Sequence, residues 1–379
     1  MMPLRRVMMI AGEASGDLHG AGVVREVKKR RPDADIFGVG GEKMKEAGMD
    51  IVYPISRLSF MGFVEVMKNL HVVRELERTL ESLLRSRTPD VVVLIDYPGF
   101  NLRFARKAKR HNIKVLYYIS PQVWAWHKSR VQRMRGVVDR MKVVFPFEVD
   151  IYQQEGINVE FVGHPLAERI GTSVPRERFF QRHGLDPAKK VLALLPGSRR
   201  QEIESIFPIL LTTARRLKKE LEVQVVVGVA SNLGSSFLRA FLHDAADVTL
   251  VENATYDVMA YANAAIVTSG TATLETGWFG TPMAVVYKTS PLTYVIGRAL
   301  VGVPHIGLVN IVAGEKIVPE FVQHELNVGN LVREMTRQLT DADYATTMRA
   351  KLSIIKKKIG EPGASGRVAD GIIELGETR

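Results

Sequence analysis

The sequence predicts an α/β protein with two doubly wound, mostly parallel sheets, and three observations support this. Short apolar runs alternate with amphipathic stretches of helical period through the first half of the chain. The same alternation starts again near residue 191, after a segment rich in turn residues. Strands that are apolar throughout are typical of parallel sheets covered by helices on both faces.

The first series of elements follows a regular order. Its apolar, β-branched runs predict strands at 6–11, 35–39, 91–95, 114–119, 140–145 and 159–162. Apolar residues at helical spacing predict helices near 17–30, 70–86, 99–110 and 127–136.

The second series repeats this pattern. It predicts strands at 191–195, 223–229, 248–251, 264–268 and 283–287. It predicts helices from the turn after residue 195 through about 219, near 235–244, and from 270.

The domain boundaries follow from the segment between the two series. Residues 163–190 are poor in strand pattern, so we place a first domain at 1–165, a second at 166–340 and a C-terminal helical segment at 341–379. Sheets of this kind bind ligands at the carboxyl ends of their strands, so we expect a cleft faced by both domains.

Composition and charge restrict the partners. The chain has 379 residues, 46% hydrophobic and 25% charged, and 52 Lys and Arg against 41 Asp and Glu give a net charge of +11. Such a charge suits nucleic acid, an anionic membrane surface or a phosphorylated substrate. No basic segment is interleaved with aromatic residues, so nucleic acid is not expected. No apolar run reaches the ~18–20 residues of a membrane span, and the lack of cysteine excludes disulfides.

A glycine turn in the second series is suited to an anion such as a diphosphate. TSGTATLETG (268–277) directly follows a predicted strand. Ser269 and Thr271 can cap the next helix, whose N-terminus favours negative charge, and Gly270 permits close approach of the backbone. Glu275 follows about a turn and a half later and suits the two hydroxyls of a ribose. An ordinary capped helix with a surface Glu fits this pattern equally well.

A second turn of the same kind occurs at LLPGSRRQEI (194–203). Ser198 lies in the turn, and we expect Arg199 to project into the cleft, where a guanidinium can clamp a diphosphate with two hydrogen bonds. A surface arginine beside a helix start is the alternative. Because two such turns occur in one domain, an ordinary capped helix and a surface arginine are each a less satisfactory explanation than an anion site.

Carboxylates follow two predicted strands of the first domain. Asp96, in VVVLIDYPGFN, lies where a buried strand ends and is a candidate general base, although an Asx turn is a common use of Asp there. Glu13 and Asp17 belong to GEASGD, after the first strand. Acidic groups on a glycine turn suit sugar hydroxyls better than phosphates.

An unusually apolar segment, LSFMGFVEVMKNL (58–70), precedes the helix predicted at 70–86. It is either an interfacial element facing lipid or a helix buried against the sheet. Its candidate lipid-facing residues are Phe60, Met61, Phe63, Val64 and Met67. No P-loop, zincin or dinucleotide-binding motif is present, which disfavours those classes of enzyme.

Together these motifs resemble the lipid-A-disaccharide synthase family, bacterial membrane-associated glycosyltransferases of the GT-B architecture, with two Rossmann-like domains. The matching segments run in order from about residue 10 to 323: AGEASGD, FMGFVEVMKNL, DYPGFN, SPQVWAWHKSRV, GHPL, LALLPGSRRQEI, TSGTATLE and VNIVAGEKIVPEFVQ. SPQVWAW and GFVEV are specific to this family, whereas SGTATLE is shared with other UDP-sugar transferases.

The resemblance implies a reaction and a location. The 2,3-diacylglucosamine unit of a UDP donor moves to the 6-hydroxyl of 2,3-diacylglucosamine 1-phosphate, with inversion and without metal or cofactor. The products are the disaccharide 1-phosphate of lipid A and UDP. The resemblance also implies a cytoplasmic protein bound peripherally to the anionic inner face of the bacterial inner membrane. It leaves open whether the protein is a homodimer.

The resemblance further implies roles for individual residues. Asp96 resembles the family's proposed base, with Glu13 as the reserve. The first domain then binds the acceptor and the membrane, the second binds the UDP-sugar, and the C-terminal segment crosses back to the first. The residues expected at the nucleotide are Ser198, Arg199, Ser269, Gly270, Thr271, Thr273, Glu275, Asn310 and Gln323.

Two other functions fit parts of the sequence. Another UDP-N-acetylglucosamine enzyme of the same fold, either a 2-epimerase or a transferase with a soluble acceptor, would not need segment 58–70 exposed. A non-catalytic lipid-binding protein at a membrane surface would give Asp96 and the two anion-binding turns no role.

Overall fold

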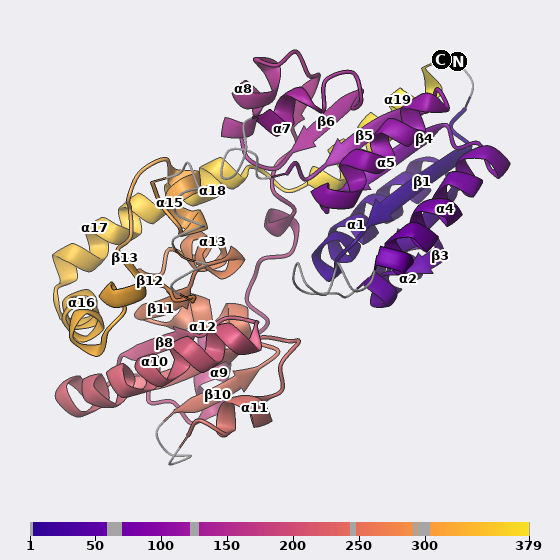
Figure 1. Cartoon of the computed structure of the whole chain (residues 1–379). Helices are drawn as coiled ribbons and strands as arrows, with labels where there is room; N and C mark the ends of the chain where they lie inside the picture. Colours follow the sequence, from indigo (N-terminus) through magenta and orange to yellow (C-terminus); the bar gives the residue numbers. More distant parts are fainter. Residues whose placement is uncertain are drawn as a thin grey trace. The chain divides into compact units, whose positions relative to one another are not determined.

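The computed structural model describes residues 3–58, 70–121, 129–242, 248–290, 294 and 304–378. The chain folds into two compact units (Figure 1). The first unit contains Met1–Glu168 and Ile359–Arg379, and the second contains Arg169–Lys358. Each has a parallel sheet with helices packed against it, so the predicted α/β fold of two parallel-sheet domains is confirmed.

The first unit has a seven-stranded parallel sheet in the order β3-β2-β1-β4-β5-β6-β7. Its strands are β1 (Arg6–Ala11), β2 (Asp35–Gly40), β3 (Asp50–Pro54), β4 (Val91–Ile95), β5 (Lys114–Tyr118), β6 (Arg140–Val143) and β7 (Val159–Phe161). The chain order reverses at β1 and β4, which pair in register from Val7 with Val91 to Ala11 with Ile95. Doubly wound sheets bind ligands beside such a reversal.

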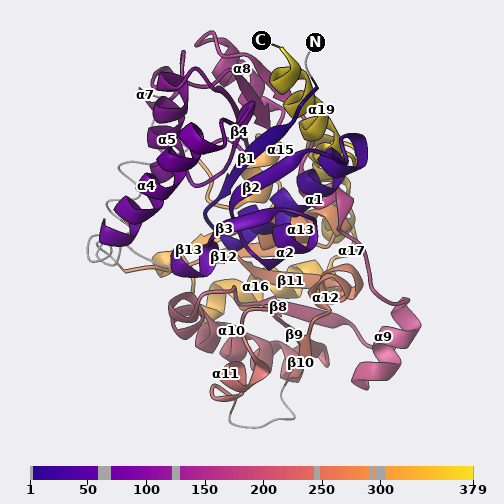
Figure 2. The same cartoon turned by 90° about the vertical axis from the view of Figure 1, so that its right-hand side faces the viewer.

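Helices cover both faces of this sheet. They are α1 (Ala14–Arg30), α2 (Glu42–Glu46), α4 (Leu70–Ser86), α5 (Pro98–Arg110), α7 (Ser129–Gln132), α8 (Phe147–Gln153) and α19 (Ala364–Glu377), with 3₁₀ turns at Ile55–Leu58 and Pro165–Glu168. One core contains apolar residues of α4 and α5 together with one side of the strands. On the other side α19 lies along α1 and contacts β4, β5 and β6 (Figure 2).

The C-terminal helix α19 is fitted closely to the first unit. Lys142 of β6 is 2% exposed, and its Nζ pairs with Glu160 Oε2 at 2.5 Å. The lysine stem lies under Gly371, where a Cβ would be 2.4 Å from Lys142 Cε. The helix therefore needs glycine at position 371 to approach the sheet.

The second unit has a six-stranded parallel sheet in the order β10-β9-β8-β11-β12-β13. Its strands are β8 (Val191–Leu195), β9 (Gln224–Val229), β10 (Thr249–Glu252), β11 (Ala264–Thr268), β12 (Met283–Tyr287) and β13 (Glu320–Val322). Its helices are α9 (Arg176–His183), α10 (Arg200–Leu221), α11 (Ser235–Arg239), α12 (Thr255–Tyr261), α13 (Thr271–Phe279), α15 (Leu308–Ala313), α16 (Val328–Thr340), α17 (Ala342–Leu352) and α18 (Ile354–Ile359), with a 3₁₀ turn at Gln323–Glu325.

Eight of the described strands and α-helices were not expected from the sequence: β3, β13, α2, α8, α9, α12, α15 and α16. Strands β3 and β13 lie at sheet edges and include residues that are only half-buried, so they lack the uninterrupted apolar run used to find strands. Helix α12 is a short helix that begins directly after an asparagine turn, and α9 lies inside the segment interpreted as a connection. Short and half-exposed elements carry the weakest periodic signal. Among the described helices, none is both long enough and apolar enough to cross a lipid bilayer.

Gly38, in the middle of β2, tests how tightly the first sheet is built. Its φ is +140°, and an added Cβ would lie 2.2 Å from the carbonyl oxygen of Met9 on the neighbouring strand. Because neither backbone can move away, Gly38→Ala is expected to lower the free energy of unfolding by about 2 kcal/mol or more. Thermal unfolding measures this. The control is Gly99→Ala in α5, where a Cβ meets no atom within 4 Å and the midpoint is expected to stay equal or rise.

Candidate functional site

A cavity of about 610 Å³ opens in the second unit beside the carboxyl ends of β8, β9 and β11. Six of the residues predicted to bind nucleotide line it: Ser198, Arg199, Ser269, Gly270, Thr271 and Glu275. Their two motifs follow β8 and β11, which are adjacent strands of the parallel sheet. Adjacent parallel strands end at the same edge, which is why motifs 70 residues apart meet here.

Both predicted glycine turns adopt a backbone that favours glycine. Gly197 has φ +105° and Gly270 has φ +151°. Gly270 is the N-cap of α13, and a Cβ there would meet no atom within 4 Å, so the space in front of this helix start is open. The N-terminus of α13 therefore presents backbone N–H groups and a positive dipole beside the cavity.

The side chains around these turns hold the backbone. Ser269 donates a hydrogen bond from Oγ to the carbonyl of Ile306 at 2.7 Å, and Thr273 donates from Oγ1 to the carbonyl of Gly270 at 2.8 Å. Arg199 is 66% exposed at its side chain and donates to Glu202 Oε1 at 2.8 Å. Its guanidinium lies at the cavity lining, where a positive charge favours an anion.

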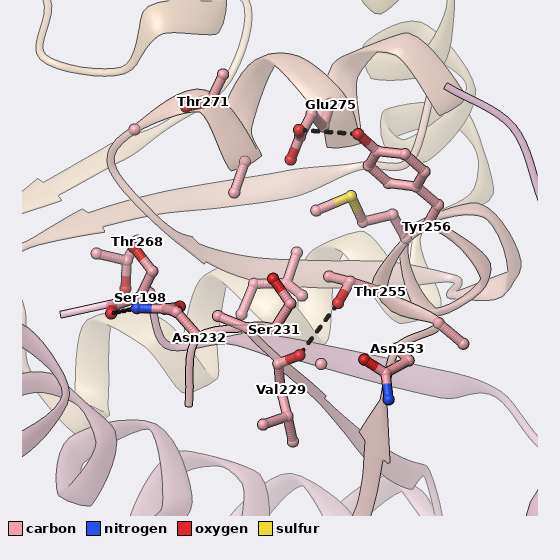
Figure 3. A pocket seen from close by; sticks show the side chains of 18 of the residues that line it. Ser198, Val229, Ser231, Asn232, Asn253, Thr255, Tyr256, Thr268, Thr271 and Glu275 are labelled. Carbon is pink, nitrogen blue, oxygen red and sulfur yellow. Dashed lines mark hydrogen bonds between the residues drawn. The ribbon is translucent and has the colours of Figure 1, made fainter. Parts of the chain in front are cut away.

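Glu275 lies further along α13 and is half-buried (Figure 3). Tyr256 of α12 donates a hydrogen bond from its hydroxyl to Glu275 Oε1 at 3.1 Å. Burial raises the pKa of Glu275, while the Tyr256 hydrogen bond and the charge of Arg169 act in the opposite direction. Burial also raises the pKa of Tyr256, so its hydroxyl remains a donor at neutral pH.

Three of the residues predicted at the nucleotide do not line the cavity. Thr273 is fully buried at the start of α13. Asn310 is fully buried, donates to Val318 O and Glu320 Oε1, and accepts from the N–H groups of Ile317 and Val318.

Gln323, the third of these residues, pairs with the backbone of Thr289 through both ends of its amide, at 2.9 and 3.0 Å. Its own φ is +55°, which is uncommon outside glycine. In all three residues the side-chain groups bind other parts of the second unit.

The cavity also contains polar residues that the sequence analysis missed. Asn232 donates to the carbonyl of Ser198 at 2.9 Å, and Thr255 donates to the carbonyl of Val229 at 3.3 Å (Figure 3). Asn232 lies in the loop after β9 and Thr255 is the first residue of α12, so neither comes from a glycine motif. Thr268 is 2% exposed, and its hydroxyl has no hydrogen-bond partner within the described part of the chain. Thr268 is the last residue of β11, and the other two lie three residues beyond a strand end, which is the signal that would have found them.

In the first unit, Asp96 lies where β4 ends, in a strained turn. Asp96 and Tyr97 have φ of +46° and +47° in succession. The carbonyl of Asp96 accepts hydrogen bonds from the amide of Asn101 at 2.7 Å and from the hydroxyl of Tyr117 at 2.6 Å. Both of these side chains are fully buried, so the turn is hydrogen-bonded to the interior of the first unit. Strained backbone of this kind is concentrated at functional sites.

The carboxyl group of Asp96 is a weaker acid than usual. Burial, the largest cause, and the negative charge of Glu13 raise its pKa to about 6, while a backbone hydrogen bond from Tyr97 opposes them. Glu13 itself is exposed, at the N-cap position of α1. A carboxylate with a pKa near 6 is a better proton acceptor than an ordinary Asp and is still mostly ionised at neutral pH.

Asp17, one of the two acidic residues of GEASGD, does not face solvent as expected for a sugar ligand. Asp17 is 5% exposed, and its carboxylate accepts hydrogen bonds from the N–H groups of Gly41, Lys43 and Met44 at 2.7 to 3.2 Å. It caps the start of α2 instead of facing solvent. Within the loop, Gly12 has the ring of Tyr97 against it, with 2.3 Å between a built Cβ and the nearest ring atom.

The predicted lipid-facing residues Phe60, Met61, Phe63, Val64 and Met67 lie outside the described residues. Within the described ranges, no three Asp, Glu or His side chains are grouped as metal ligands are.

Comparison with known proteins identifies the family. A family model described as lipid-A-disaccharide synthetase matches residues 7–364. The chain is 45% identical over 372 residues to the lipid-A-disaccharide synthase of Geobacter sulfurreducens, covering 98% of this chain and 97% of that one. The chain belongs to the lipid-A-disaccharide synthase family. Members are glycosyltransferases, and membership implies a UDP-sugar donor and a lipid acceptor.

Solved structures show the same fold in distant proteins. UDP-GlcNAc 2-epimerase from Neisseria meningitidis, bound to UDP-GlcNAc, has a TM-score of 0.66 at 14% identity and covers 97% of this chain and 100% of its own. The calicheamicin glycosyltransferase has a TM-score of 0.64 at 16% identity, covering 100% of both chains. The GT-B fold expected for a lipid-A-disaccharide synthase is therefore confirmed.

Asp17 is expected to contribute to stability. Asp17→Asn replaces one acceptor oxygen by an NH₂ group facing backbone donors, so the free energy of unfolding should fall by about 1–3 kcal/mol. Thermal unfolding measures this, with Asp33→Asn as control because Asp33 is exposed. An unchanged unfolding midpoint combined with weakened binding of the acceptor would instead support a role as a sugar ligand.

Proposed function

We propose that this enzyme transfers 2,3-diacylglucosamine from UDP to the 6-hydroxyl of 2,3-diacylglucosamine 1-phosphate, with inversion at the anomeric carbon. The products are the β-linked disaccharide 1-phosphate of lipid A and UDP. Family membership supports the substrates. The observation that carries the mechanism is the half-buried Asp96, whose pKa of about 6 suits a general base at neutral pH.

The second unit binds the donor in the cavity between its two glycine turns. Arg199 and the N-terminus of α13 at Gly270 and Thr271 meet the diphosphate, and Glu275 meets the ribose. Ser198 and Ser269 shape the turns that present these groups. Thr273 acts indirectly, because its hydrogen bond holds Gly270 of the cavity lining. Asn310 and Gln323 bond to segments that do not line the cavity and act on the fold of the second unit.

The chemical step is a single displacement. Asp96 accepts the proton of the acceptor's 6-hydroxyl as that oxygen forms a bond to C1 of the donor sugar. The bond from C1 to the β-phosphate oxygen breaks on the opposite face, which converts the α linkage into β. Negative charge then develops on UDP, where Arg199 and the α13 dipole stabilise it. Glu13 contributes by raising the pKa of Asp96.

The lipid acceptor determines where the protein works. The segment containing Phe60, Met61, Phe63, Val64 and Met67 receives acyl chains and touches the anionic inner face of the inner membrane. The excess of basic residues, +11 overall, favours that surface.

Product analysis tests this proposal. The purified protein is mixed with UDP-2,3-diacylglucosamine and 2,3-diacylglucosamine 1-phosphate in detergent with EDTA, and mass spectrometry detects disaccharide phosphate. Product that needs both lipids is expected. Asp96→Asn should lower kcat by about 10²–10⁴-fold while UDP still binds, because only the proton acceptor is lost.

Two results would contradict the proposal. One is turnover of UDP-N-acetylglucosamine with no lipid product. That result would agree with the fold but refute the assignment of lipid substrates. The other is an Asp96→Asn variant with native rate, which would move the role of base to another group.

A further inference from the structure

The first turns of α12 and the last turns of α13 meet at one aromatic residue. Glu275 and Phe279 are four residues apart on α13, so both side chains lie on one face of that helix. Tyr256 of α12 packs its ring against the ring of Phe279, with centroids 6.0 Å apart. Its hydroxyl then reaches Glu275 Oε1 at 3.1 Å. The phenol is thus fixed at both its face and its tip.

This contact occupies one oxygen of the Glu275 carboxylate. Among the described residues, the second oxygen, Oε2, makes no hydrogen bond, and both Tyr256 and Glu275 line the cavity (Figure 3). A carboxylate held at one oxygen loses rotational freedom, and its remaining lone pairs keep one direction. A fixed acceptor beside the nucleotide cavity is suited to a vicinal diol.

We propose that Tyr256 is a positioning residue that holds Glu275 as the acceptor for the ribose hydroxyls of the nucleotide, and so makes the site select ribonucleotides. This inference rests on the proposed function of the cavity. Tyr256 does not need to touch the substrate. It acts by fixing the plane of the carboxylate before the nucleotide arrives, which removes part of the entropy cost of binding.

The electrostatics of the pair support this role. Burial raises the pKa of Glu275, which favours a protonated carboxyl that would accept fewer hydrogen bonds. The hydrogen bond from Tyr256 and the charge of Arg169 lower the pKa of Glu275 and favour the ionised form. Tyr256 therefore helps to keep an acceptor that a ribose diol can use.

Selectivity follows from the cost of an unpaired buried acceptor. A nucleotide without a 2′-hydroxyl leaves part of the Glu275 carboxylate without a hydrogen bond in the cavity. Hydrogen bonds to charged groups are worth about 1.5–3 kcal/mol, so the native protein is expected to bind UDP at least tenfold more tightly than 2′-deoxy-UDP.

Calorimetric titration with UDP and 2′-deoxy-UDP tests the inference on the full chain. Tyr256→Phe should weaken the binding of UDP about three- to tenfold and leave the affinity for 2′-deoxy-UDP nearly unchanged. The ratio of the two affinities therefore falls by the same factor. The matched control is Tyr261→Phe on the same helix, because the Tyr261 hydroxyl donates to the carbonyl of Val174 and the residue does not line the cavity. This control should change neither affinity. Equal losses for both nucleotides with Tyr256→Phe would overturn the inference.

A double-substitution cycle separates positioning from simple packing. Glu275→Gln alone should reduce the preference for UDP, and adding Tyr256→Phe should reduce it no further. Independent losses would show that Tyr256 does not act through Glu275. Native protein that binds neither nucleotide would contradict the proposed function itself, whereas equal binding of both would overturn only this inference. Thermal unfolding of every variant confirms that the fold is kept.

Discussion

The positions of this enzyme's functional groups are set by the turns that follow its buried parallel strands. At the end of β4 the chain must turn sharply, and two successive residues with positive φ make that turn. The partly buried carbonyl of Asp96 would be costly without hydrogen-bond partners, and the buried Asn101 and Tyr117 supply two. These bonds hold the Asp96 side chain where it is partly shielded from water, and that shielding weakens its acidity.

The same constraint shapes the second unit in a different way. After β8 and β11 the turns use glycine, which adopts positive φ without strain, and buried Thr273 donates a hydrogen bond to the carbonyl of Gly270. The first unit thereby presents a carboxylate at the carboxyl end of β4. The second presents backbone N–H groups and an arginine after β8 and β11. A proton acceptor and an anion site are the two requirements of transfer from a nucleotide sugar.

Much of this was predictable from the sequence. Uninterrupted apolar strands predicted both sheets. The turns after β4, β8 and β11 predicted Asp96, Ser198, Arg199 and Gly270, and the helix that follows β11 predicted Glu275. The inward or outward direction of a side chain was not predictable. Asp17 and Gln323 are polar residues in recognisable motifs, yet their partners are backbone groups 24 and 34 residues away that only the fold brings near. Tyr256 was missed because its partner lies on another helix.

A direct titration of Asp96 tests the central claim that its shielded carboxyl group is the base. The ¹³C NMR signal of labelled aspartate side chains is followed against pH in the native protein and assigned by its loss in Asp96→Asn. The account predicts a pKa of about 6, with the carboxylate ionised and competent above that pH and protonated below it. Glu13→Gln should lower the value because it removes a neighbouring negative charge. A pKa near the ordinary value of about 4 would contradict the account.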